Sequence, residues 1–234
     1  MRGIDVSTHN GTIDWKKVKN DGVEFAIIRA GYGKMASQKD NKFEANYLGC
    51  KQNGIPCGAY WYSYAKDAID ARQEAAVCIE TLKHKQFELP IFIDMEEDCT
   101  RAYAREIVDA FAEVLEKEGY FVGVYSGKYF IGNNMPGVTD RYCGWIAQWA
   151  NKCDFKGPYV FWQHSEKGSF NGIKGNVDMD ICYDEGIIEK IVHGGFNGYT
   201  KTEEAKVEAV TAPTPGKVIT LTIDGQKVYE ITLQ

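Results

Sequence analysis

The chain has 234 residues, of which 44% are hydrophobic and 26% are charged, and its formal net charge is −6. This ordinary globular composition suits one large domain with a small appendage, and the acidic balance argues against a nucleic-acid-binding protein. No apolar run approaches the roughly 20 residues needed to span a bilayer, so we expect no insertion into a membrane.

Eight short apolar segments, rich in β-branched and aromatic residues, predict buried strands. They are residues 3–6, 25–30, 58–63, 90–95, 121–126, 144–148, 159–163 and 177–182. Helical patterns fill the earlier gaps. They are a helix capped by Asp14, helices over 41–52, 67–85 and 100–118, and a short helix after Ser126.

After residue 144 the strands follow one another too quickly for crossover helices. The order of elements therefore predicts an α/β fold over residues 1–196. We expect an irregular TIM-like barrel of about five β/α units followed by three strands.

The pattern changes near Asn197. Residues 197–216 are polar and contain two prolines, which predicts a linker. Residues 217–234 alternate apolar and polar positions around Asp224-Gly225, the pattern of a β-hairpin appendage. Because a lone hairpin is marginal in water, we expect it to pack on the barrel, to pair with another chain or to belong to a larger module. Self-association through its edge is one hypothesis.

The seven cysteines are irregularly spaced and include no Cys-x-x-Cys pair. This spacing does not suit a zinc site, and reduced thiols are favoured over a disulfide framework. We expect no metal and no cofactor. The first residues lead directly into a strand without a signal-peptide region, which predicts synthesis as a cytosolic protein, or an export signal that has been removed or is not needed.

The tripeptide Asp94-Met95-Glu96 follows a buried apolar run. In an extended strand, side chains two apart point the same way, so Asp94 and Glu96 share a face where the strand meets solvent. Two carboxylates held close cannot both ionise freely, and one keeps its proton at neutral pH. A glycoside hydrolase needs such an acid to protonate a leaving sugar oxygen. Taken alone, the motif also fits two solvated loop acids.

Eight motifs then follow one another along residues 1 to 190. They are GIDVSTHNG (3–11), FAIIRAG (25–31), GAYWYSYA (58–65), PIFIDME (90–96), GVYSG (123–127), WIAQW (145–149), WQ (162–163) and GNVDMD (175–180). This set, in this order, closely resembles the family-25 glycoside hydrolases, the lysozyme family of phage endolysins and bacterial muramidases.

The resemblance implies hydrolysis of the β-1,4 bond between N-acetylmuramic acid and N-acetylglucosamine in peptidoglycan. Glycan strands of peptidoglycan are then the expected partner, and the bacterial cell wall is the expected place of action. Both a holin-released endolysin and a secreted mature enzyme fit this interpretation.

The resemblance further implies Glu96 as the proton donor and Asp94, Asp5 and Asp178 as the other acids of the site. Asp180 is a rival to Asp178, because the two residues are two apart in one strand; we favour Asp178. We expect Asp94 to stay charged and to orient the substrate's acetamido group, whose carbonyl attacks the anomeric carbon with net retention. A covalent Asp94 intermediate and an inverting attack by water remain open.

Aromatic and polar residues near the predicted strand ends are candidates for sugar binding, because sugar C–H faces pack on aromatic rings. They are Tyr62, Tyr125, Trp149, Tyr60, Gln148 and Arg29. Core packing is the alternative for the aromatic residues, and a structural ion pair is the alternative for Arg29. Two rival functions are a barrel that binds wall glycans without cutting them and a metal-dependent hydrolase that uses the acids as ligands.

Overall fold

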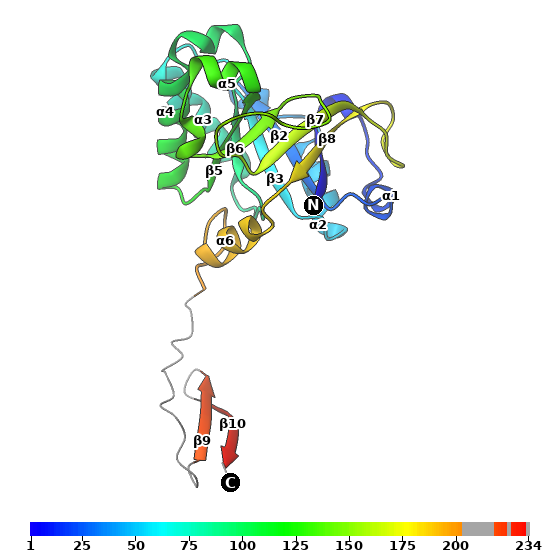
Figure 1. The fold of residues 1–234 in the computed structure, drawn as a ribbon, viewed down its shortest axis with the longest axis vertical. Helices are drawn as coiled ribbons and strands as arrows, with labels where there is room; N and C mark the ends of the chain where they lie inside the picture. The colour runs from blue at the N-terminus through cyan, green and yellow to red at the C-terminus, as the bar shows by residue number, and fades with distance from the viewer. Residues whose placement is uncertain (203–217, 224–225, 233–234) are drawn as a thin grey trace. The chain divides into compact units, whose positions relative to one another are not determined.

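The computed structural model describes residues 1–202, 218–223 and 226–232, and the chain divides into two compact units, Met1–Lys201 and Thr202–Gln234. In the first unit eight strands close into a barrel in sequence order (Figure 1). They are β1 (Arg2–Val6), β2 (Phe25–Tyr32), β3 (Cys57–Tyr62), β4 (Ile91–Asp94), β5 (Val122–Gly127), β6 (Cys143–Ala147), β7 (Phe161–Gly168) and β8 (Val177–Cys182). Each adjacent pair from β1–β2 to β6–β7 is parallel, and β8 is antiparallel to both β7 and β1. The predicted irregular TIM-like α/β barrel is confirmed.

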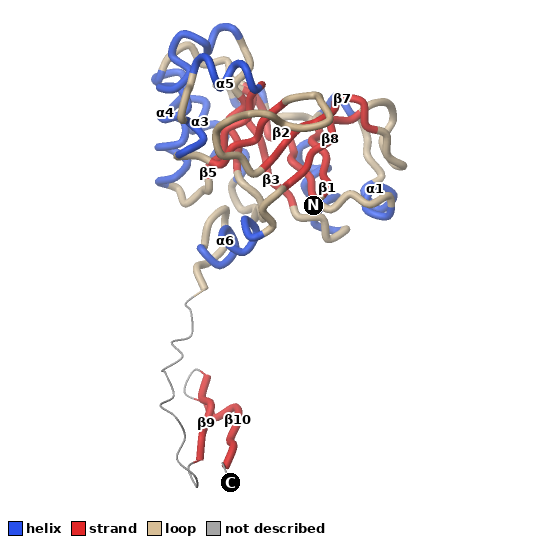
Figure 2. Tube along the Cα trace, in the orientation of Figure 1, coloured by secondary structure: helices blue, strands red, loops and turns tan. Residues whose placement is uncertain are grey.

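Six helices accompany the strands of this unit (Figure 2). They are α1 (Trp15–Asn20), α2 (Phe43–Gln52), α3 (Ala68–Leu82), α4 (Ala104–Lys117), α5 (Lys128–Asn134) and α6 (Gly186–Gly194). The cap predicted for α1 is present, because the Asp14 side chain accepts the Lys17 N–H. The connections 148–160 and 169–176 contain no helix, as the close spacing of the last strands predicted. No helix in the described part of the chain is long and apolar enough to cross a membrane.

Three elements show the largest differences from the predictions. Strand β7 continues to Gly168, five residues beyond its predicted end. Helix α4 begins at Ala104, because a 3₁₀ turn, Asp98–Tyr103, precedes it. Helix α6 was not predicted, although Ile187 and Ile191 are spaced four apart and are buried on one face. All seven cysteines are free thiols, as expected.

Strand alternation sorts the apolar side chains into two clusters. Phe25, Phe92, Trp145 and Phe161 belong to the cluster of inward-facing strand residues, whereas Ala26 and others of opposite parity pack against the helices. The inward aromatic rings contact one another edge to face, with centroids 5.1 to 5.6 Å apart. They form a dense apolar floor at the centre of the barrel.

Asn197 joins the segment after α6 to the barrel. Its side chain is fully buried; Oδ1 accepts the Phe121 N–H at 2.8 Å and Nδ2 donates to the Leu89 carbonyl at 2.8 Å. Its φ of 53° lies in the left-handed region, which asparagine tolerates better than most residues. Because of these bonds the compact unit continues to Lys201, five residues beyond the barrel boundary expected at 196.

The second unit contains an antiparallel pair, β9 (Val218–Ile223) and β10 (Gln226–Thr232), with Ile223 opposite Gln226. These are the strands predicted for the hairpin. Residues 203–216 of the expected linker lie outside the described residues, as do residue 217 and the Asp224-Gly225 turn of the expected hairpin. The role of this unit, including self-association, stays a prediction.

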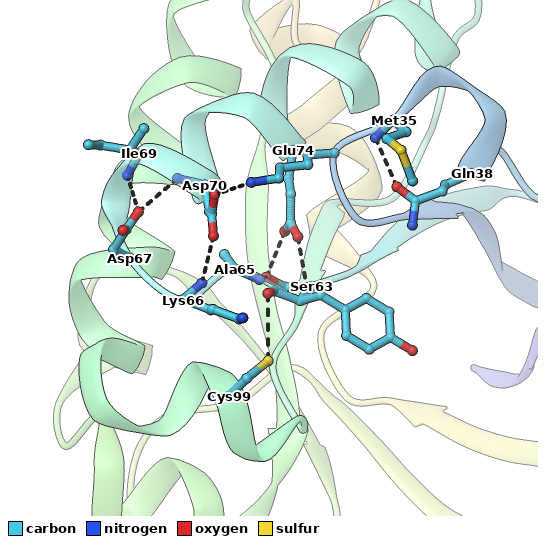
Figure 3. A network of polar contacts seen from close by, with 12 residues as sticks. Met35, Gln38, Ser63, Ala65, Lys66, Asp67, Ile69, Asp70, Glu74 and Cys99 are labelled. Carbon is cyan, nitrogen blue, oxygen red and sulfur yellow. Dashed lines mark hydrogen bonds and ion pairs between the residues drawn. The ribbon is translucent and has the colours of Figure 1, made fainter.

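Glu74 of α3 holds the turn that follows β3 (Figure 3). Its carboxylate accepts the Ser63 hydroxyl at 2.7 Å and the Tyr64 N–H at 2.9 Å, and the side chain is buried. Burial raises the pKa of Glu74 to about 7, although the two hydrogen bonds oppose the shift. The turn that carries Tyr64 therefore rests on a carboxyl group that titrates near neutrality.

We predict that Asn197→Ala lowers the free energy of unfolding by about 2–4 kcal/mol, because one buried and one partly buried backbone group lose their partners at roughly 1–3 kcal/mol each. Urea unfolding measures the change. Asn197→Gly is the matched control: it loses the same bonds but adopts a positive φ without strain, so it should be less destabilising than Ala. Wild-type stability of the Ala variant would contradict the role of Asn197.

We predict that Glu74→Gln removes part of the pH dependence of stability. The folded state raises the pKa of Glu74 from 4.5 to about 7, so the wild type loses stability as pH rises through this window. Glutamine mimics the protonated acid, since it can donate to Ser63 Oγ while accepting the Tyr64 N–H. Thermal unfolding at pH 4 to 8 measures the melting temperature of both proteins. The melting temperature of the variant should rise relative to that of the wild type as the pH increases. Equal pH dependence of the two melting temperatures would refute the prediction.

Candidate active site

A cleft of about 500 Å³ opens at the end of the barrel where the parallel strands finish. Nine of the ten predicted site residues line it. They are Asp5, Arg29, Tyr60, Tyr62, Asp94, Glu96, Tyr125, Trp149 and Asp178. Gln148 borders an adjoining hollow instead. The barrel thus gathers residues that are up to 173 positions apart, from Asp5 to Asp178, around one opening.

Asp94 is the last residue of β4 and is 3% exposed. Backbone bonds hold the segment on both sides, since the Asp94 carbonyl accepts the Ser63 N–H and the next amide, of Met95, donates to the Tyr125 carbonyl. The carboxyl atom Oδ1 is buried and has no hydrogen-bond partner among the described residues. Burial, and then the negative charge of Glu96, raise the pKa of Asp94 well above its ordinary value.

Glu96 lies two residues further on, at the exposed rim of the same cleft. The walls of the cleft withdraw its carboxyl from water and raise its pKa; Glu97 and Asp178 add to the rise, and the Tyr62 hydroxyl opposes it. Both acids are therefore shifted towards the neutral form. Burial opposes the expected ionisation of Asp94 more strongly than that of Glu96, because Asp94 is the more deeply buried of the two. The charge of Asp94 in the protein without substrate stays a prediction.

The register of β8 separates Asp178 from Asp180. Asp178 pairs with Asp5 across the antiparallel β1–β8 ladder and lines the cleft. Asp180 is buried further into the barrel, where it accepts the Trp145 indole N–H at 2.8 Å. Burial, with Glu166 nearby, raises the pKa of Asp178 to about 6. The favoured residue, Asp178, is the one that faces the cleft.

Asp5 is held by a residue that was not predicted, Gln163. Its amide Nε2 donates to Asp5 Oδ2 at 2.8 Å, while Oε1 accepts the Tyr125 hydroxyl at 3.0 Å and the Trp149 indole N–H at 3.1 Å. An indole nitrogen can only donate, which fixes the orientation of the amide. Its place at the end of a predicted strand, in the Trp-Gln motif, was a signal that could have identified it.

Arg29 forms the structural ion pair that was its alternative interpretation, whereas a contact of Arg29 with substrate stays a prediction. Its Nε donates to Asp40 Oδ2 at 2.8 Å, and the same oxygen accepts the Thr8 N–H, so it forms a structural ion pair. Arg29 also borders the cleft, and its positive charge opposes the rise in the pKa of Asp94.

The predicted aromatic residues differ in burial. Tyr60 and Tyr125 are nearly buried, and Tyr62 donates its hydroxyl to Glu97 at 2.7 Å. Trp149 is 57% exposed, so its ring face is open to a ligand. The intervening Trp61 points to the other side of β3 and donates to the Gly33 carbonyl. The cleft therefore combines carboxyl groups with aromatic walls, as a sugar-binding site does.

The described residues contain no group of three or more His, Cys, Asp or Glu side chains arranged to hold a metal ion. The chemistry that the arrangement favours is proton transfer between crowded carboxyl groups and a bound molecule.

Comparison with known proteins agrees with this geometry. The uncharacterized protein YegX of Escherichia coli O6:H1 is 30% identical over 212 residues, which cover 86% of this chain and 75% of that protein. An autolytic lysozyme of Clostridium acetobutylicum is 31% identical over 191 residues, 80% of this chain and 57% of that protein.

Among solved structures, the modular autolysin LytC of Streptococcus pneumoniae, in complex with a synthetic peptidoglycan ligand, superposes with a TM-score of 0.70 at 28% identity. The similarity covers 78% of this chain but only 46% of LytC, so this chain spans less than half of that autolysin. The family described as glycosyl hydrolases family 25 matches residues 4–173. Because this match takes in most of the barrel, the chain belongs to family 25 of the glycoside hydrolases.

Proposed function

We propose that this chain is a lysozyme, an endo-β-1,4-N-acetylmuramidase that hydrolyses the bond between N-acetylmuramic acid and N-acetylglucosamine in bacterial peptidoglycan. The observation that carries the proposal is the presence of Asp94 and Glu96 in one open cleft with aromatic walls. The names of the clostridial autolytic lysozyme and of the pneumococcal complex with a peptidoglycan ligand support the same substrate. The proposed place of action is the cell wall.

Glu96 is the proposed general acid. It lies at the rim, where its longer side chain can reach a glycosidic oxygen, and its raised pKa favours the protonated form that a general acid needs. When the glycosidic C–O bond breaks, the proton of Glu96 passes to the leaving sugar oxygen. Glu96 is then ionised and can accept a proton from the water that completes hydrolysis.

Asp94 is the proposed orienting group. Its unpartnered Oδ1 can accept the N–H of the substrate's acetamido group. A hydrogen bond to the charged form favours that form, so substrate binding would ionise Asp94 and leave the proton with Glu96. Substrate binding would thus produce an ionised Asp94 beside a protonated Glu96, a difference that burial alone does not produce. The acetamido carbonyl then attacks the anomeric carbon, and two displacements give net retention.

Asp5 and Asp178 complete the acidic wall of the cleft. In their ionised forms they would stabilise the positive charge that develops on the sugar ring as the bond breaks. No cleft acid of the matched motifs is replaced by a neutral residue, which favours the enzyme over a barrel that only binds glycans.

We predict that Glu96→Gln lowers turnover by about 10²–10⁴-fold, the usual contribution of a general acid, with little loss of stability because the side chain is exposed. Turbidity of a peptidoglycan suspension measures the rate, and mass spectrometry of the new reducing ends identifies the bond. Reducing ends on N-acetylglucosamine would contradict a muramidase.

The matched control is Asp98→Asn, which changes an exposed acid whose carboxylate is bonded to the neighbouring Arg101. It should retain the wild-type rate. A folded Glu96→Gln variant that lyses the wall as fast as this control would remove Glu96 from the proposed role.

A further inference from the structure

A second hollow adjoins the acid cleft. It encloses about 560 Å³ between the start of α5 and the loop that follows β6. Glu96, Tyr125 and Trp149 border both the hollow and the acid cleft. A chain molecule whose reacting bond lies at Glu96 can therefore continue into the hollow without leaving the surface.

Two aromatic rings are exposed at this hollow. Tyr129 is 75% exposed and Trp149 is 57% exposed, although burying such rings is strongly favourable. Exposed aromatic residues gathered at a hollow are typical of a binding surface.

Both rings are held in place. The Lys128 ammonium lies 4.6 Å from the centroid of the Tyr129 ring and forms an ion pair with Asp154 at 2.5 Å. The indole N–H of Trp149 is bonded to Gln163. Rings fixed before binding lose little conformational entropy when a ligand stacks on them.

A polar group accompanies the rings. The Gln148 side-chain oxygen accepts the Asp154 N–H at 3.0 Å, and the Gln148 side chain also hydrogen-bonds the Asp154 carboxyl and lowers its pKa. These bonds hold a polar amide at the border of the hollow. Apolar ring faces beside a polar amide match a pyranose unit, which has C–H faces and polar groups at its edge.

We propose that this hollow is a further saccharide-binding subsite, which takes an N-acetylated sugar of the same glycan beyond the units in the acid cleft, and that Tyr129 determines the preference for longer chains. The proposal rests on the proposed function, because it presumes a glycan whose cleaved bond lies at Glu96. It assigns Tyr129 a contact with substrate but no part in the chemical step.

The experiment compares cleavage of peptide-free peptidoglycan glycans of four and of eight sugars. For the wild type, kcat/KM should be higher for the longer substrate. Tyr129→Ala should lower the ratio of the two kcat/KM values by about fivefold, a typical effect of removing an aromatic contact. Tyr129→Trp retains a ring and should preserve the ratio.

Tyr183→Ala is the control, because Tyr183 is a similarly exposed tyrosine that follows the carboxyl end of the antiparallel β8, at the opposite end of the barrel. An unchanged ratio in Tyr129→Ala overturns the proposal. An equal fall of this ratio in Tyr183→Ala also overturns the proposal. A fall of the ratio in Tyr129→Trp as large as that in Tyr129→Ala overturns it as well.

Binding separates this proposal from the proposed function. The eight-sugar glycan is titrated into Glu96→Gln while tryptophan fluorescence is followed, since Trp149 borders the hollow. Two double variants, which add Tyr129→Ala or Tyr183→Ala to Glu96→Gln, are titrated in the same way. Weaker binding by the variant with Tyr129→Ala, but not by the one with Tyr183→Ala, supports the subsite even if the wild type cleaves nothing. Equal affinity of all three proteins overturns the subsite even if the wild type is an active lysozyme.

Discussion

The antiparallel pairing of β8 with both β1 and β7 is the constraint on which the site depends. In a parallel strand, residues near the start lie at the opposite end of the barrel from the catalytic rim. Because β8 runs the other way, its first residues lie at that rim, and Asp178 pairs directly with Asp5. The same reversal places Asp180, two residues later, one layer deeper against Trp145. One change of strand direction thus supplies an acid to the cleft and a buried acid beneath it.

Burial of these carboxyl groups opposes stability while it prepares the site for proton transfer. Burial raises the pKa of both Asp94 and Glu96, so part of the folding free energy is lost when the pH is high enough to ionise them. Perturbed pKa values are frequent at functional sites. The acids lie above the apolar floor that contains Phe92 and Trp145, and the close packing of this floor compensates in part for their desolvation.

Local patterns predicted what depends on local structure. Alternation and spacing identified the eight strands, and the two-residue period placed Asp94 and Glu96 on one face. The depth of a side chain along the barrel axis is a tertiary property. The two-residue alternation of side chains along a strand could therefore not distinguish Asp178 from Asp180. It also could not show that Asp94 is more buried than Glu96. The partners of Arg29 and Asp5 lie 11 and 158 residues away, beyond any local pattern.

Gln163 links the aromatic wall of the cleft to one of its acids. Because the indole of Trp149 can only donate, the amide oxygen of Gln163 must face it, and the amide nitrogen must face Asp5. Asp5 Oδ2 is therefore an acceptor in either ionisation state, and a proton on Asp5 has to reside on Oδ1. Rotation of Trp149 away from Gln163 would remove one of the two donors that fix this arrangement. The position of the Trp149 indole and the orientation of the Asp5 carboxyl are therefore coupled through one amide group.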